Sequence, residues 1–161
     1  DGLEKAAKKK QLLSHISLQG ISFHSLNLAE LRLYASSIKG CTFFKTSFKL
    51  STLSQSNVFD TRFNKTSFYK STLKNGSFSY SVLTDVDFSA SVLKQMTFKE
   101  VNFKNVRFND SVWEHLTFEN CTFIDCSFDG LKSSHINLIK SPSLESILEL
   151  KVKTKQSQEK M

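Results

Sequence analysis

The sequence predicts an all-β solenoid of about six four-sided coils, with a short helix at each end. Three observations support it: an apolar residue recurs at every fifth position, a small residue precedes it by two places, and similar phrases return every twenty residues. An amphipathic helix needs apolar residues three and four apart, and a half-buried strand needs alternation. Because a period of five fits neither, we expect the chain to turn a corner after each group of five.

The apolar series keeps one register over 23 consecutive members, is broken at Ser133 and resumes at Leu138. Its uninterrupted members are Leu18, Phe23, Leu28, Leu33, Ile38, Phe43, Phe48, Leu53, Val58, Phe63, Phe68, Leu73, Phe78, Leu83, Phe88, Leu93, Phe98, Phe103, Phe108, Trp113, Phe118, Phe123 and Phe128. Two positions earlier stand small or medium residues such as Ser51 and Ser71. One large and one small inward residue in every five indicate a short extended side followed by a corner.

The twenty-residue recurrence sets the number of sides. The phrases are "STLSQ" at 51–55, "STLKN" at 71–75, "SVLKQ" at 91–95 and "SVWEH" at 111–115. Four groups of five therefore make one turn, and Leu53, Leu73, Leu93 and Trp113 are predicted to stack in one column. Neighbouring coils are expected to lie roughly 4.8 Å apart, the spacing of hydrogen-bonded strands.

These groups resemble the pentapeptide-repeat family, whose pattern is a small residue, a polar residue, Leu or Phe, and two variable residues. The phrases that carry the resemblance are "CTFID", "CSFDG", "TSFYK" and "VNFKN", and it extends over about residues 16–138. The resemblance implies a right-handed quadrilateral parallel β-helix.

The repeat divides the chain into four segments. We expect a capping helix over 1–15, the β-helix over 16–140, a second capping helix over 141–151 with Ser141 or Ser143 as N-cap, and a flexible basic tail over 152–161. Helices at both ends would cover sheet edges that otherwise recruit other chains. Since the chain opens on Asp1, we expect it to be a fragment of a longer protein.

The sequence offers no group that marks an enzyme. It has no P-loop, GxGxxG or GxSxG motif, no CxxC and no apolar run long enough to span a membrane. Cys121 and Cys126 occupy inward small positions, which favours buried filler over reactive thiols. His115 and His135 share a column, where a polar ladder is a better interpretation than a metal pair. We therefore expect no catalytic residue, no cofactor and no metal.

The charge is uneven along the predicted rod. The whole chain carries a formal charge of +7, which favours encounter with acidic partners. Residues 16–80 hold eight Lys or Arg against two acids, whereas residues 81–138 hold five against eight. The rod is therefore expected to be dipolar along its axis.

The basic half also presents aromatic side chains at outward positions, namely Tyr34, Phe44, Phe59, Tyr69 and Tyr80. The predicted columns place seven residues around one corner over two neighbouring coils: Phe44, Lys45, Lys49, Leu50, Lys65, Tyr69 and Lys70. Exposed aromatics mixed with cations are typical of an interface. The alternative is a solvated basic face with scattered exposed rings.

These features predict a non-enzymatic binding or scaffold module that presents a protein-interaction surface, within a secreted effector or a larger protein. The alternative is a nucleic-acid- or topoisomerase-associated protein, because the family that the chain resembles includes proteins that mimic DNA and act on gyrase. Mimicry needs an acidic surface, so the basic charge favours direct nucleic-acid binding through the basic half. A purely structural spacer is a third interpretation. The sequence leaves open the oligomeric state and the compartment, cytoplasmic or exported.

Overall fold

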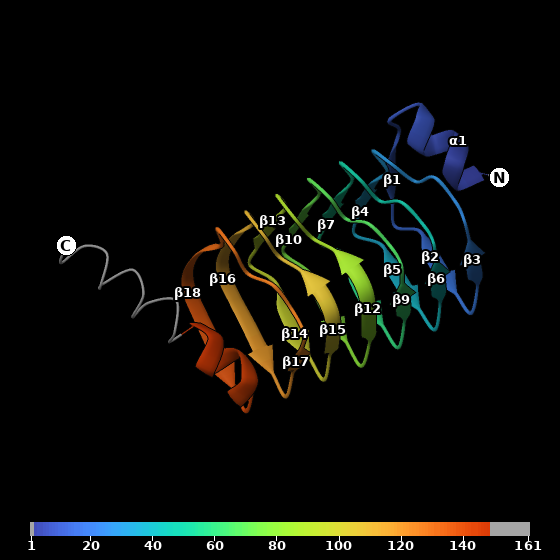
Figure 1. Cartoon of the computed structure of the whole chain (residues 1–161). Coiled ribbons are helices and arrows are strands. Elements are labelled where there is room, and N and C mark those ends of the chain that lie inside the picture. The colour runs from blue at the N-terminus through green and yellow to red at the C-terminus, as the bar shows by residue number, and fades with distance from the viewer. Residues whose placement is uncertain (1, 149–161) are drawn as a thin grey trace.

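The chain winds into a four-sided parallel β-helix of about six turns with one helix at each end (Figure 1). The computed structural model describes residues 2–148. Residues twenty apart pair in parallel, as Leu53 does with Leu73 and Phe78 with Phe98. Four five-residue sides per turn, as the recurrence predicted, account for this register.

The strands form three of the four sides. The first side contains β1 (Leu12–Ser14), β4 (Arg32–Tyr34), β7 (Thr52–Ser54), β10 (Thr72–Lys74) and β13 (Val92–Lys94). The second contains β2 (Ser17–Gln19), β5 (Ser37–Lys39), β8 (Asn57–Phe59), β11 (Ser77–Ser79) and β14 (Thr97–Lys99). β16 (Val112–Glu119) and β18 (Lys132–Ile139) run along both of these sides and join them into one twelve-stranded sheet.

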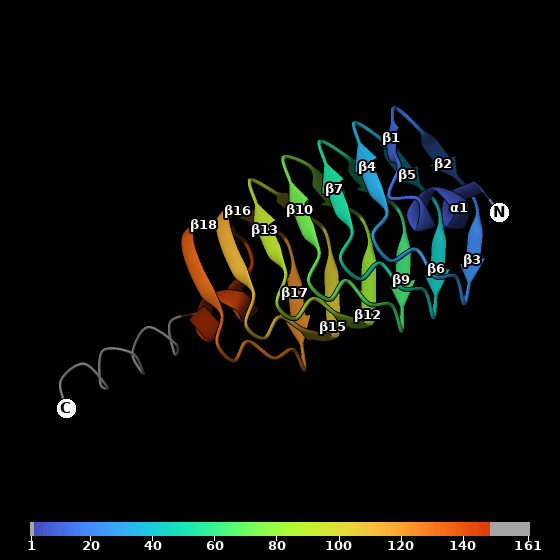
Figure 2. The same ribbon diagram turned by 90° about the horizontal axis from the view of Figure 1, so that it is seen from above.

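The third side is a six-stranded sheet, and its strands form a row beside that of the first side in Figure 2. It contains β3 (Ser22–His24), β6 (Thr42–Phe44), β9 (Arg62–Asn64), β12 (Val82–Asp87), β15 (Asn102–Arg107) and β17 (Thr122–Ile124). The fourth side is held by single parallel bridges such as Ser47 to Ser67 and Arg107 to Ser127. It is the least sheet-like face of the rod.

A residue with positive φ stands at every corner. Every fifth residue from Lys10 to Lys140 adopts this conformation, of which 24 are not glycine. This is how a chain with five glycines and one proline bends so often. Each such residue with a β-carbon carries a strain on the order of 1 kcal/mol, which the stacking of neighbouring coils must offset.

Stacked phenylalanine rings fill the core. On the fourth side, Phe68 lies parallel to Phe48 and to Phe88, with centroids 4.8 Å apart in both pairs. The small inward positions close the turn next to these rings, because the Ser71 hydroxyl donates to the Phe68 carbonyl at 2.6 Å and the Ser91 hydroxyl to that of Phe88 at 2.5 Å. Burial of one large side chain per side supplies most of the stability, since each buried aromatic removes a large apolar area from water.

The N-terminal helix α1 (Gly2–Lys8) is shorter than the expected range of 1–15. It ends because Lys10 already has a φ of 52°, which makes the first corner, and residues 12–14 continue as β1. Ala6 and Ala7 are buried against the first coil. The helix therefore covers the end of the rod with Leu3, Ala6 and Ala7, and the strand register begins earlier than expected.

The C-terminal helix covers 142–148 within the described residues, and its Leu144 side chain is completely buried. Ser141 precedes the helix, but its hydroxyl accepts from the Cys121 amide at 3.1 Å, as a small inward residue of the coil would do. The Ser143 hydroxyl accepts in the same way from the Phe123 amide at 3.2 Å. Residues 149–151 of the expected helix and the expected tail 152–161 lie outside the described residues.

The break in the apolar series at Ser133 does not interrupt the coil. Ser133, which breaks the apolar series, still pairs with Trp113 in register, although its side chain is exposed. In the part of the chain that the structure describes, no helix has the length and apolar character that crossing a membrane requires.

Candidate interaction surface

The seven residues predicted as an interaction surface all point outward from two neighbouring coils. Phe44 ends β6, Lys45 and Lys65 stand at the corner between the third and fourth sides, and Lys49, Leu50, Tyr69 and Lys70 continue across the fourth side to its next corner. The seven residues therefore extend across the whole fourth side, from one corner to the next, whereas the sequence predicted that they surround a single corner. We call these seven residues the basic aromatic surface.

One half of this surface is built around Phe44. The Lys45 ammonium lies 5.3 Å and the Lys65 ammonium 5.8 Å from the centre of the Phe44 ring. The His24 ring packs edge-on against Phe44 from the preceding coil, at 5.6 Å. A ring flanked by two cations is attracted to both by its quadrupole, with a contribution of about 0.5–1 kcal/mol each at an exposed site.

The other half contains Leu50, Tyr69 and Lys70. Leu50 is 52% and Tyr69 37% exposed, and the Lys70 ammonium lies 5.4 Å from the Tyr69 ring. The Leu50 amide donates to the Tyr69 carbonyl at 2.9 Å, so the two side chains are held on adjacent coils. Lys49 lies between the halves, and its amide donates to the Ser47 hydroxyl at 3.4 Å. The surface thus presents apolar area surrounded by four ammonium groups.

A second aromatic cluster lies at the corner between the second and third sides, away from this surface. Phe59 and Tyr80 meet edge-to-face at 5.5 Å and are 42% and 50% exposed. The Lys39 ammonium lies 5.7 Å from the Phe59 ring. Sequence reasoning named both rings as outward aromatics but did not join them, although the offset of twenty between Lys39 and Phe59 was a usable signal.

The comparisons with known proteins concern the repeat and the fold. Residues 60–123 match the family model described as "Pentapeptide repeat region". Over this stretch the chain is similar to the pentapeptide-repeat proteins. Comparison with proteins of curated function finds no match by sequence.

Comparison with solved structures finds pentapeptide-repeat proteins. A trypsin-treated variant of QnrB1, a plasmid-mediated fluoroquinolone resistance protein, aligns with a TM-score of 0.63 at 16% identity, over 78% of this chain and 73% of that chain. Rfr23 from the cyanobacterium Cyanothece 51142 aligns at 0.32 and 6% identity, over 85% and 97%. HetL from Nostoc sp. strain PCC 7120 aligns at 0.27 and 10% identity, over 80% and 87%. At 16% identity the QnrB1 likeness shows the fold alone.

The thiols of the pentapeptide-repeat coils occupy inward positions. Burial raises the pKa of the Cys121 thiol to about 11 and also raises the pKa of Cys126. A thiol with a raised pKa supplies little thiolate near neutral pH, and thiolate is the nucleophilic form. Cys41 is buried as well. These positions act as filler between coils.

The histidine column forms a stack. The rings of His115 and His135 lie 4.4 Å apart and 14° from parallel. Among residues 2–148, no group of three or more His, Cys, Asp or Glu side chains is arranged to hold a metal ion. His115 and His135 thus form a stacked pair on adjacent coils, both at corner positions.

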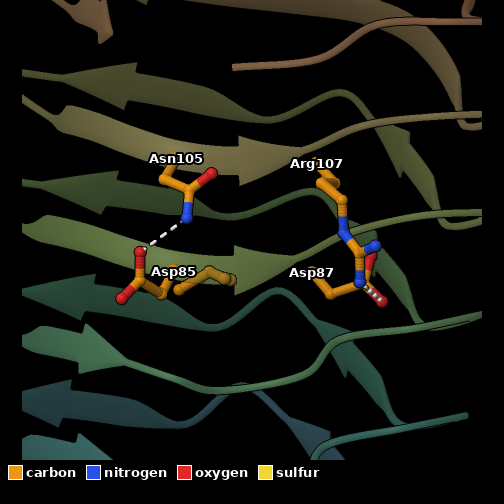
Figure 3. Close-up of a pocket in the computed structure, with 5 residues that line it drawn as sticks. Asp85, Asp87, Asn105 and Arg107 are labelled. Carbon is orange, nitrogen blue, oxygen red and sulfur yellow. Dashed lines mark hydrogen bonds and ion pairs between the residues drawn. The ribbon is translucent and has the colours of Figure 1, made fainter. Parts of the chain in front are cut away.

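An open depression of about 330 Å³ lies where the third side meets the fourth, on the two coils that directly follow the basic aromatic surface. Figure 3 shows its polar lining: the Asn105 amide donates to an Asp85 carboxylate oxygen at 2.7 Å, and Arg107 bonds to Asp87 at 3.3 Å. Both contacts join residues twenty apart on adjacent coils. The lining is polar and shallow, and its main chemical character is acidic.

Proposed function

We propose that the chain is a non-enzymatic binding module, which presents the basic aromatic surface to a protein partner and works within a longer protein such as a secreted effector. The observation that carries the proposal is the arrangement of Phe44 between two lysines, beside exposed Tyr69 and Leu50. Interface cores are enriched in aromatic side chains, and a cationic surround favours an acidic partner.

The scaffold supports this role because it holds the surface rigidly. Each coil of the surface is hydrogen-bonded to a coil on either side, as at β6, which pairs with both β3 and β9. The rings therefore need little ordering when a partner binds, which lowers the entropic cost of association.

The proposal is tested by affinity capture from cells that produce the protein, followed by quantitative mass spectrometry. The Phe44→Ala, Tyr69→Ala double variant should lose the partners that the wild type retains. The matched control is Phe59→Ala with Tyr80→Ala, which removes two exposed rings at another corner and should retain them. Equal retention by the wild type and the Phe44, Tyr69 variant would contradict the proposal.

A second candidate is direct binding of single-stranded nucleic acid, favoured by exposed rings that alternate with lysines. Affinity for an oligonucleotide should then fall steeply with salt, because binding releases counterions from the phosphates. A shallow salt response would exclude this candidate. A topoisomerase-directed DNA mimic is less compatible with the formal charge of +7.

A further inference from the structure

The fourth side carries opposite charges at its two ends. Over the five coils from residue 45 to residue 130, its lysines all come first: Lys45, Lys49, Lys65 and Lys70. The aspartates all follow: Asp85, Asp87, Asp110, Asp125 and Asp129, with Arg107 as the one cation among them. This side is therefore balanced in charge, although the whole chain carries +7.

Most of these charges have no ionic partner among residues 2–148. Across residues 2–148, the ion pairs join Lys10 to Glu30, Lys94 to Glu114 and Arg107 to Asp87. Only the last lies on the five coils of the fourth side, where Figure 3 shows it. The four lysines and Asp110, Asp125 and Asp129 are exposed and point into solvent.

Because of this order of charges, the fourth side of one copy is complementary in charge to the fourth side of a second copy that runs in the opposite direction. A two-fold axis perpendicular to the rod brings the same side, and the same corner, of two copies face to face with their coils in opposite order. If the axis passes through the coil of residues 85–90, the coil 45–50 lies opposite 125–130 and the coil 65–70 lies opposite 105–110. This follows from the register, because equivalent positions are twenty residues apart throughout the side.

That register sets unlike charges against each other. Lys45 faces Asp125, Lys49 faces Asp129 and Lys70 faces Asp110, each twice by symmetry. Tyr69 faces Asn109, a polar partner for its hydroxyl. The two copies of Asp85 meet near the axis, where each Lys65 lies one coil away, roughly 4.8 Å along the rod.

We propose that two copies of this chain associate antiparallel through their fourth sides, with the basic aromatic surface of each against the aspartates of the other. The inference rests on the proposed function, because it names a second copy as the partner of that surface. The contact runs over about 20 Å of rod, from five coils at the strand spacing. An interface of this size that is rich in charges is weak and sensitive to salt.

Sedimentation equilibrium tests the association. The purified chain should be a concentration-dependent dimer in about 50 mM NaCl, and the dissociation constant should rise by roughly tenfold or more in about 500 mM NaCl, because salt screens exposed charges. A chain that stays monomeric at low salt up to several hundred micromolar would overturn the proposal. So would a dimer whose affinity does not change with salt.

Charge reversal tests the pairing. The triple variant Lys45→Glu, Lys49→Glu, Lys70→Glu and the triple variant Asp110→Lys, Asp125→Lys, Asp129→Lys should each be monomeric, because like charges then meet at every contact. Mixed in equal amounts, the two variants should form a heterodimer, since the contacts 45 to 125, 49 to 129 and 70 to 110 again join unlike charges. Failure of the mixture to associate, with both variants folded by circular dichroism, would overturn the proposal.

Cross-linking tests the orientation. Ser89 lies on the coil of the axis, so Ser89→Cys should be joined between copies by a short bis-maleimide. The control Ser79→Cys, at the equivalent position of the second side and also half-buried, should not exceed the unmodified chain. Equal cross-linking of the two variants would exclude the antiparallel arrangement.

The aspartate variant also separates this inference from the proposed function. It leaves the basic aromatic surface intact, so an outside acidic partner should still bind it. If that partner binds and the wild-type chain is monomeric, the self-association is wrong and the binding module remains. If the Phe44→Ala, Tyr69→Ala variant loses neither partner nor dimer, the surface itself is wrong.

Discussion

Gly76 lies so close to Ser56 on the coil below that a β-carbon at Gly76 would overlap the Ser56 carbonyl oxygen. The space beside this glycine is taken from the other direction by Met96, whose sulfur lies 3.3 Å from the Gly76 nitrogen. A small residue and a large one thus share a column in which other coils hold serine, leucine or isoleucine. The pair shows that the volumes of neighbouring side chains in a column compensate for each other, while the five-residue backbone repeat stays the same.

Replacement of Gly76 by Ala should therefore destabilise the protein although alanine suits most inward small positions. Because the obstacle is backbone, we expect a loss of about 1–3 kcal/mol in the free energy of unfolding, the usual cost of overpacking. Urea denaturation followed by circular dichroism measures it. Gly2→Ala is the control, since no atom lies within contact distance of its added β-carbon, and it should change the stability little. Equal stabilities of the two variants would contradict the prediction.

The phenylalanine ladder predicts a strong dependence on ring area. Phe68 is fully buried between Phe48 and Phe88, within 4° of parallel to both. Phe68→Ala should cost about 3–5 kcal/mol, because it leaves a cavity among rings. Phe68→Leu should cost much less, since leucine fills the equivalent position at Leu28. Chemical denaturation of both variants, together with limited proteolysis, tests this, and similar losses for the two would argue against the ladder as a source of stability.

The positive φ angles at the corners predict opposite effects for two nearby alanines. Ala35 has a φ of 50°, so Ala35→Gly should relieve strain and stabilise the protein by up to about 1 kcal/mol. Ala29 is not among the residues with positive φ, so Ala29→Gly should only add conformational entropy to the unfolded chain and destabilise by about 0.5–1 kcal/mol. Thermal denaturation of both variants provides the comparison. Changes of the same sign would show that corner strain does not govern stability here.

Cys121 predicts a pH dependence of stability on the alkaline side. Its pKa is about 11 in the folded protein against 9.0 for the free thiol, because burial disfavours the thiolate. The folded state therefore keeps a proton that the unfolded state loses, and this contribution is complete below pH 9.0 and is lost as the pH approaches 11.

Urea denaturation of the wild type and Cys121→Ser across this range measures the difference. The wild type should lose stability more steeply than the serine variant, which fits because Ser81 fills the same column. Alkylation at pH 8 should leave Cys121 unmodified until the protein unfolds. Parallel pH profiles for the two proteins would contradict the assignment.

The repeat was predictable because backbone geometry forces it. A large inward residue at every fifth position fixes the length of each side at five residues. The twenty-residue recurrence then fixes the number of sides in one turn at four. The helix predicted over 1–15 is too long, because its range rests on the helix-favouring residue types of this segment. The five-residue period of apolar residues gives a different boundary. Leu13 stands five residues before Leu18 and is half-buried in β1, so the register already contained the signal for a strand there.

The interaction surface was predicted as a set of residues and not as an arrangement. Counting in twenties placed the lysines and rings on neighbouring coils, but it could not show that Lys65 reaches back over Phe44 or that Lys39 lies over Phe59. Long outward side chains have several rotamers at each corner, and their neighbours decide among them.

The sequence by itself determined the coil, its four sides, the inward columns and the polarity of charge along the rod, since each follows from a spacing that the backbone converts into direction. The tertiary structure alone decided the left-handed conformation of each corner, the exchange of volume between Gly76 and Met96, and the grouping of rings with ammonium groups. The physical reason is that periodicity specifies where a β-carbon points, whereas contacts between coils specify what the rest of the side chain meets.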